Sequence, residues 1–319
     1  MKRIISIALA CIMLAAALAL TACTGAAPAE KVTIRMAALK GPTGMGTAPL
    51  MDKEKYPDYD ITISADPSAV TASFIAGEYD VAAVPVNVAS VLYNKLEGDV
   101  VMLGITTLGV LYIVEDGSEI NSVADLSGKT LYATGQGSTP EYVLNYILDK
   151  NGLSDVTVEY KAEHSELASL MATGEVTLGM MPEPNVTTTM KKNPDLRVAL
   201  DLTAEWDKVS DTQLVQGVLI ARRSFADEHE AQIKTLIGDY TKAAELINTA
   251  SDEAAQMIVD AEILPAAPVA KAAIPRCNIV FISGENMKKT ASAMFEVLFT
   301  ADPKSVGGKV PGEDMYFVK

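Results

Sequence analysis

An internal repeat limits the folds that are open to this chain. Residues 61–85 (ITISADPSAVTASFIAGEYDVAAVP) align without a gap on residues 158–182 (VEYKAEHSELASLMATGEVTLGMMP). Each copy reads as a strand, a capped helix that stops at a glycine, a short apolar strand and a proline. The identical pairs are Ala65 and Ala162, Ser68 and Ser165, Gly77 and Gly174, Glu78 and Glu175, and Pro85 and Pro182. The repeat predicts two lobes of similar α/β design, although one continuous sheet could also hold both copies.

Strands and helices are expected to alternate outside the repeat as well. Strands are expected at 31–39, 59–65, 81–84, 100–105, 110–114, 130–133 and 215–221. Helices are expected after Ser68 and at 140–150, 225–249, 251–262 and 285–300. Residues 106–109 would form a loop, and Pro49 would delay the first helix to about Thr47. Alternation of this kind predicts an α/β fold with parallel strand pairing.

The order of these elements predicts how the chain divides. Lobe one is expected to comprise residues 31–110 and 219–319, and lobe two residues 115–212. Residues 110–114 and 213–218 are expected to cross between the lobes as a two-stranded hinge. Such a hinge allows two lobes to close around a ligand.

The N-terminal residues predict export and lipidation. Lys2 and Arg3 precede an apolar run from Ile4 to Leu20, which ends in Leu20-Thr21-Ala22-Cys23. This order resembles the bacterial lipobox, in which the cysteine is acylated and becomes the mature N-terminus. Residues 1–22 are therefore expected to be a lipoprotein signal peptide, and residues 23–30 a disordered tether. The alternative is an ordinary signal peptide that happens to contain Cys23.

Composition argues against several classes of partner. Removing residues 1–22 takes away Lys2 and Arg3 but none of the 41 acidic residues, so the net charge changes from −15 to −17. A chain this acidic is not expected to bind nucleic acid or to adsorb on anionic lipid, so its membrane contact would be the lipid on Cys23 alone. Cys277 would be the one cysteine without a role in export, so no disulfide is expected. His164 and His229, far apart in sequence, do not suggest a metal site.

Four loops follow predicted strands, where α/β sheets bind ligands. They are residues 41–46, 85–87, 135–141 and 182–185. The third is the most informative, because Gly135 and Gly137 would leave backbone N–H groups free at the start of a helix capped by Ser138 or Thr139. A plain helix cap is the alternative reading. The residues expected to bind the ligand are Gly41, Pro42, Thr43, Gly44, Met45, Asn87, Thr106, Thr107, Gly137, Ser138, Thr139, Glu183, Asn185 and Gln216.

Two polar residues admit more than one reading. Glu183 could bind a cationic group of the ligand, or it could complement a helix N-terminus, which is slightly favoured. His164 at a helix start is expected to be solvated or to act as a cap.

The first loop lacks the Gly-Lys-Ser/Thr that would complete a nucleotide-binding P-loop. No GxSxG nucleophile elbow is present, so catalysis is not expected.

Several segments together carry a resemblance to a known family. Residues 111–114 (LYIV), 125–130 (DLSGKT) and 137–141 (GSTPE) are similar to the NMT1/THI5-like group of solute-binding proteins, and Gly77-Glu78-Tyr79-Asp80 followed by Pro85 also fits. That group includes the binding proteins for nitrate, alkanesulfonates, taurine and the thiamine pyrimidine. The similarity extends from about Thr33 to Arg222. The cleft loops contain no arginine or lysine that would mark a sulfonate or nitrate site, although Lys40 adjoins the first loop.

The resemblance implies a fold, a function and partners. The fold would be the type II periplasmic-binding fold, two α/β lobes joined by a two-stranded hinge, with no cofactor and no metal. The chain would be an extracytoplasmic, lipid-anchored and monomeric binding protein that delivers a small anionic or zwitterionic solute to an ABC permease and its ATPase. Two alternatives stay open: an enzyme of the same fold in pyrimidine or menaquinone-type biosynthesis, and a ligand-sensing lobe for a membrane receptor. An exported lipoprotein favours binding over biosynthesis.

Overall fold

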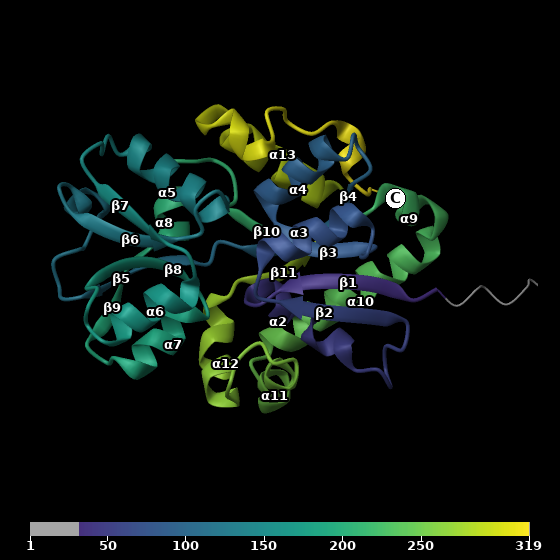
Figure 1. Ribbon diagram of the computed structural model, residues 1–319, viewed down its shortest axis with the longest axis horizontal. Helices are drawn as coiled ribbons and strands as arrows, with labels where there is room; N and C mark the ends of the chain where they lie inside the picture. Colours follow the sequence, from purple (N-terminus) through teal and green to yellow (C-terminus); the bar gives the residue numbers. More distant parts are fainter. Residues whose placement is uncertain (1–31, 319) are drawn as a thin grey trace, which may run out of the picture. The chain divides into compact units, whose positions relative to one another are not determined.

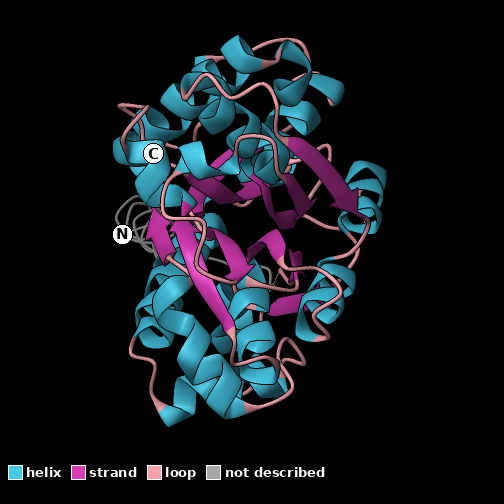
Figure 2. Cartoon of the chain, turned by 90° about the vertical axis from the view of Figure 1, so that its left-hand side faces the viewer, coloured by secondary structure: helices cyan, strands magenta, loops and turns pink. Residues whose placement is uncertain are grey.

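Two separate sheets organise the chain, so the reading with one continuous sheet is wrong (Figure 1). The computed structural model describes residues 32–318, and from Ile34 onward these belong to one unit. The expected signal peptide (1–22), the tether (23–30) and Cys23 lie outside the described residues. Figure 2 shows the strands inside this unit with helices packed outside them.

The first sheet has six strands in the order β11-β4-β10-β3-β1-β2. Their bounds are β1 Ile34–Leu39, β2 Tyr59–Ser64, β3 Val81–Pro85, β4 Val101–Leu108, β10 Val215–Ala221 and β11 Ile279–Ile282. β1 pairs in parallel with β2 and β3, whereas the pairs β10–β3, β10–β4 and β11–β4 are antiparallel. The sheet is therefore mixed, and not wholly parallel as the alternation of elements suggested.

The second sheet has five strands in the order β7-β6-β8-β5-β9. Their bounds are β5 Leu111–Asp116, β6 Thr130–Thr134, β7 Thr157–Lys161, β8 Leu178–Pro182 and β9 Leu196–Asp201. β6 pairs in parallel with β7 and β8, and β5 is antiparallel to β8 and β9. We call the first sheet with helices α2–α4 and α9–α13 the first lobe, and the second sheet with helices α5–α8 the second lobe.

Helices connect the strands in both lobes. The α-helices are α2 Pro42–Thr47, α3 Pro67–Ala76, α4 Val86–Lys95, α5 Thr139–Lys150, α6 His164–Ala172, α7 Asn185–Lys192, α8 Leu202–Asp207, α9 Arg223–Glu228, α10 Glu230–Asn248, α11 Asp252–Asp260, α12 Ala267–Ala273 and α13 Gly284–Ala301. The 3-10 helices are η1 Ala48–Met51, η2 Val123–Leu126, η3 Ile274–Arg276, η4 Pro303–Val306 and η5 Glu313–Met315. In the described part of the chain, none of the helices has the length and apolar character needed to span a bilayer.

The sequence repeat corresponds to two equivalent strand–helix–strand units. The first is β2–α3–β3 and the second is β7–α6–β8. In each, the preceding strand (β1 or β6) pairs with both strands of the unit. Both helices end at a glycine in the left-handed region, Gly77 with φ 80° and Gly174 with φ 76°, which a residue without Cβ adopts at no steric cost. The predicted unit is confirmed, but Asp66 caps α3 and Ser68 only donates its N–H to that carboxylate.

Two local expectations near the sheet edges are wrong. Thr106 and Thr107 continue strand β4 instead of forming a loop, because β4 pairs with β10 on one side and β11 on the other. A short helix, α2, already starts at Pro42, since proline suits the first helical position and the turn ends before Pro49.

The chain passes between the sheets ahead of β5, at Gly109 and Val110, and again between α8 and β10.

One apolar cluster runs through both lobes. It includes Val143 and Leu144 of α5, in the second lobe, and Met294 and Phe295 of α13, in the first. All four side chains are fully buried. This packing joins the two lobes through buried apolar side chains.

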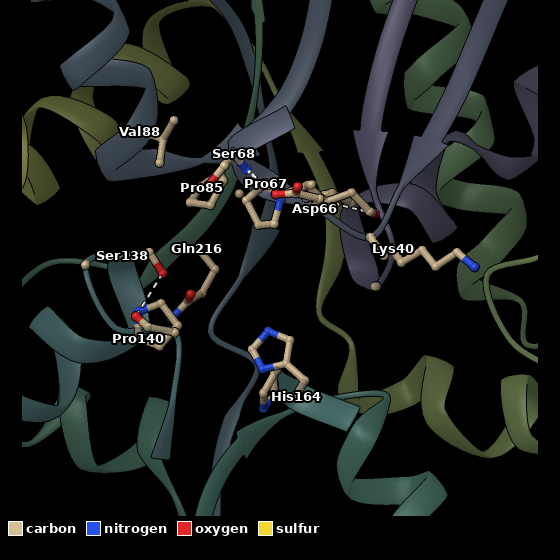
Figure 3. Close-up of a pocket in the computed structure, with 18 of the residues that line it drawn as sticks. Lys40, Asp66, Pro67, Ser68, Pro85, Val88, Ser138, Pro140, His164 and Gln216 are labelled. Carbon is tan, nitrogen blue, oxygen red and sulfur yellow. Dashed lines mark hydrogen bonds between the residues drawn. The ribbon is translucent and has the colours of Figure 1, made fainter. Parts of the chain in front are cut away.

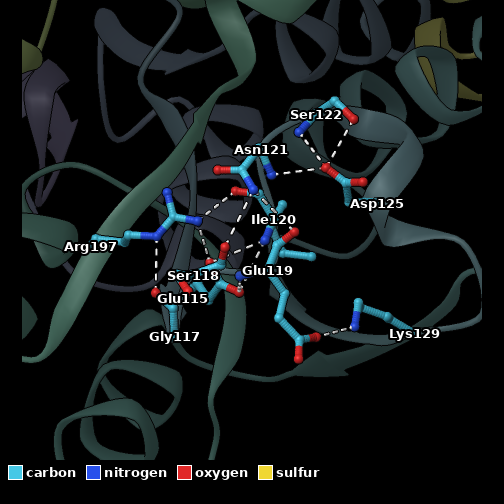
Figure 4. Close-up of polar contacts among 10 residues, drawn as sticks. All are labelled: Glu115, Gly117, Ser118, Glu119, Ile120, Asn121, Ser122, Asp125, Lys129 and Arg197. Atoms are coloured by element: carbon cyan, nitrogen blue, oxygen red, sulfur yellow. Dashed lines mark hydrogen bonds and ion pairs between the residues drawn. The ribbon is translucent and has the colours of Figure 1, made fainter.

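A polar network stabilises the second lobe away from the cleft (Figure 4). The buried carboxylate of Glu115 accepts hydrogen bonds from the N–H groups of Glu119 and Ile120. Arg197 on β9 donates to the same carboxylate over 2.6 Å and to the carbonyl oxygen of Gly117 over 3.0 Å. The network therefore fastens the turn after β5 to the neighbouring strand β9.

Candidate ligand-binding cleft

A cleft of about 910 Å³ lies between the two lobes, and equivalent loops of the repeat form its walls (Figure 3). Residues 39–43 after β1 correspond to residues 135–140 after β6. Residues 65–68 after β2 correspond to residues 160–164 at the end of β7, and Pro85 after β3 corresponds to residues 182–185 after β8. The cleft therefore lies where the carboxyl ends of the parallel strands of both sheets meet.

The structure brings many of the predicted binding residues to this cleft. Those that line it are Gly41, Pro42, Thr43, Thr107, Gly137, Ser138, Glu183, Asn185 and Gln216. The others are placed behind the wall: Gly44, Met45, Asn87, Thr106 and Thr139. Met45 is fully buried with its sulfur 3.9 Å from Cys277 Sγ, and a Cβ on Gly44 would lie 2.6 Å from the Leu39 oxygen. These two residues are needed for packing of α2 against its neighbours.

Asn87 and Thr139 connect the two lobes behind the cleft. The Asn87 Oδ1 on α4 accepts hydrogen bonds from the Thr139 N–H over 3.1 Å and from the Thr139 hydroxyl over 2.9 Å. Both residues are buried, so water does not compete for these bonds. The second and third predicted loops therefore meet through hydrogen bonds between Asn87 and Thr139.

In the third loop, the backbone N–H groups of Gly137, Ser138 and Thr139 are bound within the protein and are not free for a ligand. Gly137 N–H donates to the Glu141 carboxylate over 2.5 Å, and Ser138 N–H donates to the Gly135 oxygen over 3.1 Å. The Ser138 hydroxyl also donates to the Gly135 oxygen. Ser138 is the N-cap residue, and its side chain bonds no helix N–H. With the Thr139 N–H bound to Asn87, the start of α5 is largely saturated by the protein itself.

Glu183 is fully buried at the cleft wall and is already paired. Its carboxylate accepts from the Thr187 N–H and hydroxyl at the start of α7, over 3.0 and 2.9 Å. Arg276 of the first lobe donates its Nε–H to Glu183 over 2.6 Å and a second N–H to the Thr187 hydroxyl over 2.7 Å. The reading in which Glu183 complements a helix N-terminus is confirmed, and an ion pair between the lobes, absent from the sequence reading, adds to it.

His164 lies half-buried in the cleft wall and does not cap α6, so the expectation of a capping histidine is wrong. It is the first residue of α6, and its Nδ1 is 2.6 Å from the Thr134 hydroxyl oxygen. Burial lowers its pKa from 6.5 to about 4, because the charged imidazolium loses hydration. The ring is therefore neutral at neutral pH and contributes a polar but uncharged surface to the cleft.

Other cleft residues were missed by the sequence reading. Lys40, Asp66, Ser68, Lys95, Tyr160 and Lys161 line the cleft. Asp66 is occupied as the cap of α3, Lys161 lies over the Tyr132 ring at 5.1 Å, and the Lys40 side chain extends away from the middle of the cleft (Figure 3). For Asp66, Ser68, Tyr160 and Lys161 the repeat held the signal, because the loops after β2 and β7 are equivalent loops at the carboxyl ends of strands.

Three polar atoms of the cleft wall are buried without a hydrogen-bond partner among the described residues. They are Thr107 Oγ1, Gln216 Nε2 and the Tyr160 hydroxyl oxygen. Thr107 and Gln216 come from the first lobe and are 2% and 8% exposed. Tyr160 comes from the end of β7 in the second lobe. Polar atoms of this kind usually have a partner, so they mark positions where a ligand can supply one. Among residues 32–318, no three metal-ligating side chains gather in one place.

Comparisons with known proteins agree on one architecture. A family model described as "ABC transporter, phosphonate, periplasmic substrate-binding protein" matches residues 50–262. An ABC transporter structure from Parabacteroides distasonis has a TM-score of 0.76 at 21% identity, over 89% of this chain and 98% of that one. The aliphatic sulphonate binding protein SsuA from Escherichia coli has a TM-score of 0.69 at 20% identity, over 91% and 96%.

The alkanesulfonate-binding protein SsuA from Xanthomonas axonopodis pv. citri, bound to MOPS, has a TM-score of 0.67 at 16% identity, over 91% of this chain and 98% of that one. Among curated protein sequences, none matches this chain. At these identities the structural likeness establishes the two-lobed periplasmic-binding fold, and the family model covers most of the chain. The chain therefore belongs to the periplasmic substrate-binding proteins of ABC transporters, in the family described by the phosphonate model.

Proposed function

We propose that this substrate-binding protein captures a small anionic or zwitterionic organic solute in the cleft between its lobes and passes it to an ABC permease. The observation that carries the proposal is the cleft of about 910 Å³ whose walls are equivalent loops of the two lobes. Pockets of this size accommodate small organic molecules. A solute that contacts both walls would be enclosed when the lobes move together.

The charges of the cleft favour an anionic group over a purely cationic ligand. The Glu183 carboxylate is already paired with Arg276, and the Asp66 carboxylate accepts two N–H groups of α3. Neither is left to bind a cation, and of the described carboxylates that line the cleft only Glu163 is without such a contact. Lys95 and Lys161 line the same cleft. The similar structures include proteins named for alkanesulfonate and nitrate binding, which supports an oxyanion ligand here too.

We place the chain in the NMT1/THI5-like subgroup. One support is the motif DLSGKT at residues 125–130. The other is the fold that the chain shares with sulfonate- and nitrate-binding proteins, since sulfonates and nitrate are ligands of that subgroup. We also infer a monomer without catalytic activity or cofactor. The passages between the sheets, at Gly109 and Val110 and between α8 and β10, would act as the hinge. They overlap only in part with the stretches expected to cross, 110–114 and 213–218.

The chain is further proposed to be held at the outer face of the membrane by lipid on Cys23, on the basis of the Leu20-Thr21-Ala22-Cys23 sequence. Buried acyl chains contribute about 0.8 kcal/mol per methylene, so two or more chains anchor a protein stably. Cys23→Ser is expected to move the protein from the membrane fraction to the soluble extracytoplasmic fraction. Retention of the variant in carbonate-washed membranes would contradict lipid anchoring.

The function is tested by melting the protein with a panel of phosphonates, sulfonates, nitrate and amino-sulfonates. A cognate ligand at a hundredfold excess over its Kd should add about 2.7 kcal/mol to the free energy of unfolding. Ala72→Trp puts a large side chain into the cleft from an exposed position of α3, and Ala231→Trp does so on α10 outside the cleft. Ligand should stabilise wild type and Ala231→Trp but not Ala72→Trp. If all three respond equally, the ligand does not bind in the cleft.

A further inference from the structure

The first-lobe wall contains two buried polar side chains that the protein does not satisfy. Thr107 Oγ1 and Gln216 Nε2 have no hydrogen-bond partner among residues 32–318, although both residues are more than nine-tenths buried. A buried polar atom without a partner destabilises the folded state, and most such atoms in proteins are paired. Both residues line the cleft, so a bound molecule can pair them.

Strand register places these two residues on adjacent strands at one end of the first sheet. Gly217 of β10 is opposite Pro85 of β3 on one side and opposite Thr107 of β4 on the other. Gln216 precedes Gly217, so it lies between the end of β3 and the end of β4. Figure 3 shows Gln216 below Pro85 and beside Ser138, with Pro140 lower in the view. Gln216 is therefore next to the start of α4, which follows Pro85 directly, and Thr107 lies on the other side of β10 from Pro85.

The start of α4 has no side chain to balance its N–H groups. Its N-cap is Pro85, no side chain caps it, and no acidic residue occupies its first turn. The other long helices that begin at the cleft differ. Asp66 caps α3, and Glu183 accepts an N–H of α7. Acidic residues occupy the first turns of α5 and α6. Among the described helices of eight or more residues at the cleft, α4 alone has neither a side chain that accepts one of its N–H groups nor an acidic residue in its first turn, so its positive end is the one least balanced by the protein.

We propose that Thr107, Gln216 and the start of α4 form a subsite for the oxyanion headgroup of the ligand, on the first-lobe wall. The proposal rests on the proposed function and adds where the charged group is held. Gln216 supplies an amide N–H, Thr107 a hydroxyl, and α4 the partial positive charge of its first turn. In the third loop, where the sequence placed this group, the N–H groups of Gly137 and Thr139 are bound within the protein.

Tyr160 gives the subsite a counterpart on the facing wall. Its hydroxyl oxygen is the third cleft atom that is buried without a partner among the described residues. It belongs to the second lobe, at the end of β7. A ligand whose headgroup is held by Thr107 and Gln216 can extend toward Tyr160, so that one molecule contacts both lobes.

Calorimetry with methanesulfonate, methylphosphonate and acetate tests the subsite. The variants are Thr107→Val and Gln216→Leu, which remove the polar atoms with little change in volume. Thr203→Val is the matched control, because Thr203 Oγ1 is also buried without a partner among the described residues but does not line the cleft. Thr107→Val and Gln216→Leu are each expected to weaken binding of the best probe about tenfold or more, since hydrogen bonds to a charged group are stronger than those between neutral groups. Thr203→Val should bind as wild type does.

The stability of the ligand-free variants gives a second readout. Because each substitution removes an unpaired buried polar atom, the free variants should unfold at the same denaturant concentration as wild type or a higher one. A merely structural role would lower that concentration. If Gln216→Leu does not fold, the binding and the stability of Thr107→Val alone test the subsite.

Two results would overturn the subsite and leave the proposed function intact. The first is that Thr107→Val binds the probe as tightly as wild type does. The second is that none of the three probes binds, while another solute stabilises wild type and fails to stabilise Ala72→Trp. Loss of the proposed function itself would show as equal stabilisation of Ala72→Trp and wild type.

Discussion

Single residues show both the reach and the limit of the sequence. The loops after β1, β3, β6 and β8 could be found from the strand pattern alone, and residues such as Thr43, Ser138 and Glu183 do line the cleft. Their bonding partners could not be found, because they come from distant parts of the chain. Arg276 meets Glu183 from 93 residues away, and Thr139 meets Asn87 from 52 residues away. Local sequence carries no signal for such pairs.

The ion pair between Glu183 and Arg276 leads to a prediction at this scale. Arg276→Ala leaves the fully buried Glu183 carboxylate with only the donors of Thr187, so the free energy of unfolding should fall by about 1–3 kcal/mol. Adding Glu183→Gln should recover part of that loss, because a neutral amide costs less to bury than an unpaired charge. Urea unfolding of both single variants and the double variant measures this coupling.

An exposed ion pair provides the control. Lys271 and Asp252 are 2.7 Å apart, with side chains 52% and 93% exposed. Lys271→Ala should therefore change the free energy of unfolding by at most about 1 kcal/mol. The account of Glu183 fails if Arg276→Ala is no more harmful than Lys271→Ala, or if Glu183→Gln restores nothing in the Arg276→Ala background.

At the scale of elements, the repeat predicted two equivalent strand–helix–strand units that the structure contains. It placed the β2–α3–β3 and β7–α6–β8 units and the glycine that ends each helix. It could not predict that β4 extends through Thr106 and Thr107, because that extension depends on pairing with β10 and β11. Nor could it place the cap of α3, where Asp66 and Ser68 compete and the carboxylate two residues earlier takes the role.

The equivalence of the two units can be measured through their terminal glycines. Gly77→Ala and Gly174→Ala should each lower the free energy of unfolding by about 1 kcal/mol, since both positions have positive φ and an added Cβ has space around it. Gly238→Ala is the control within α10, where a Cβ meets nothing within 4 Å and helix propensity should raise stability by about 0.8–1.0 kcal/mol. A cost at one of the two terminal glycines but none at the other would show that the two helices do not end in the same way.

The whole molecule depends on contacts that join the lobes without filling the space between them. Asn87 with Thr139, Glu183 with Arg276, and the apolar packing of α5 against α13 all lie around the cleft. These contacts fix where the lobes meet and leave the cleft open between the carboxyl ends of the strands. The repeat predicted two lobes, but only the assembled structure shows which of their helix starts remain uncapped at the cleft.

The most direct test of the account is small-angle X-ray scattering with and without the ligand found in the melting panel. A solute held between the two walls should draw the lobes together, so the radius of gyration of the wild-type protein should decrease at saturating ligand. The scattering of Ala72→Trp should not change, because its cleft is filled. A ligand that binds wild type tightly and leaves its radius of gyration unchanged would contradict binding between the lobes.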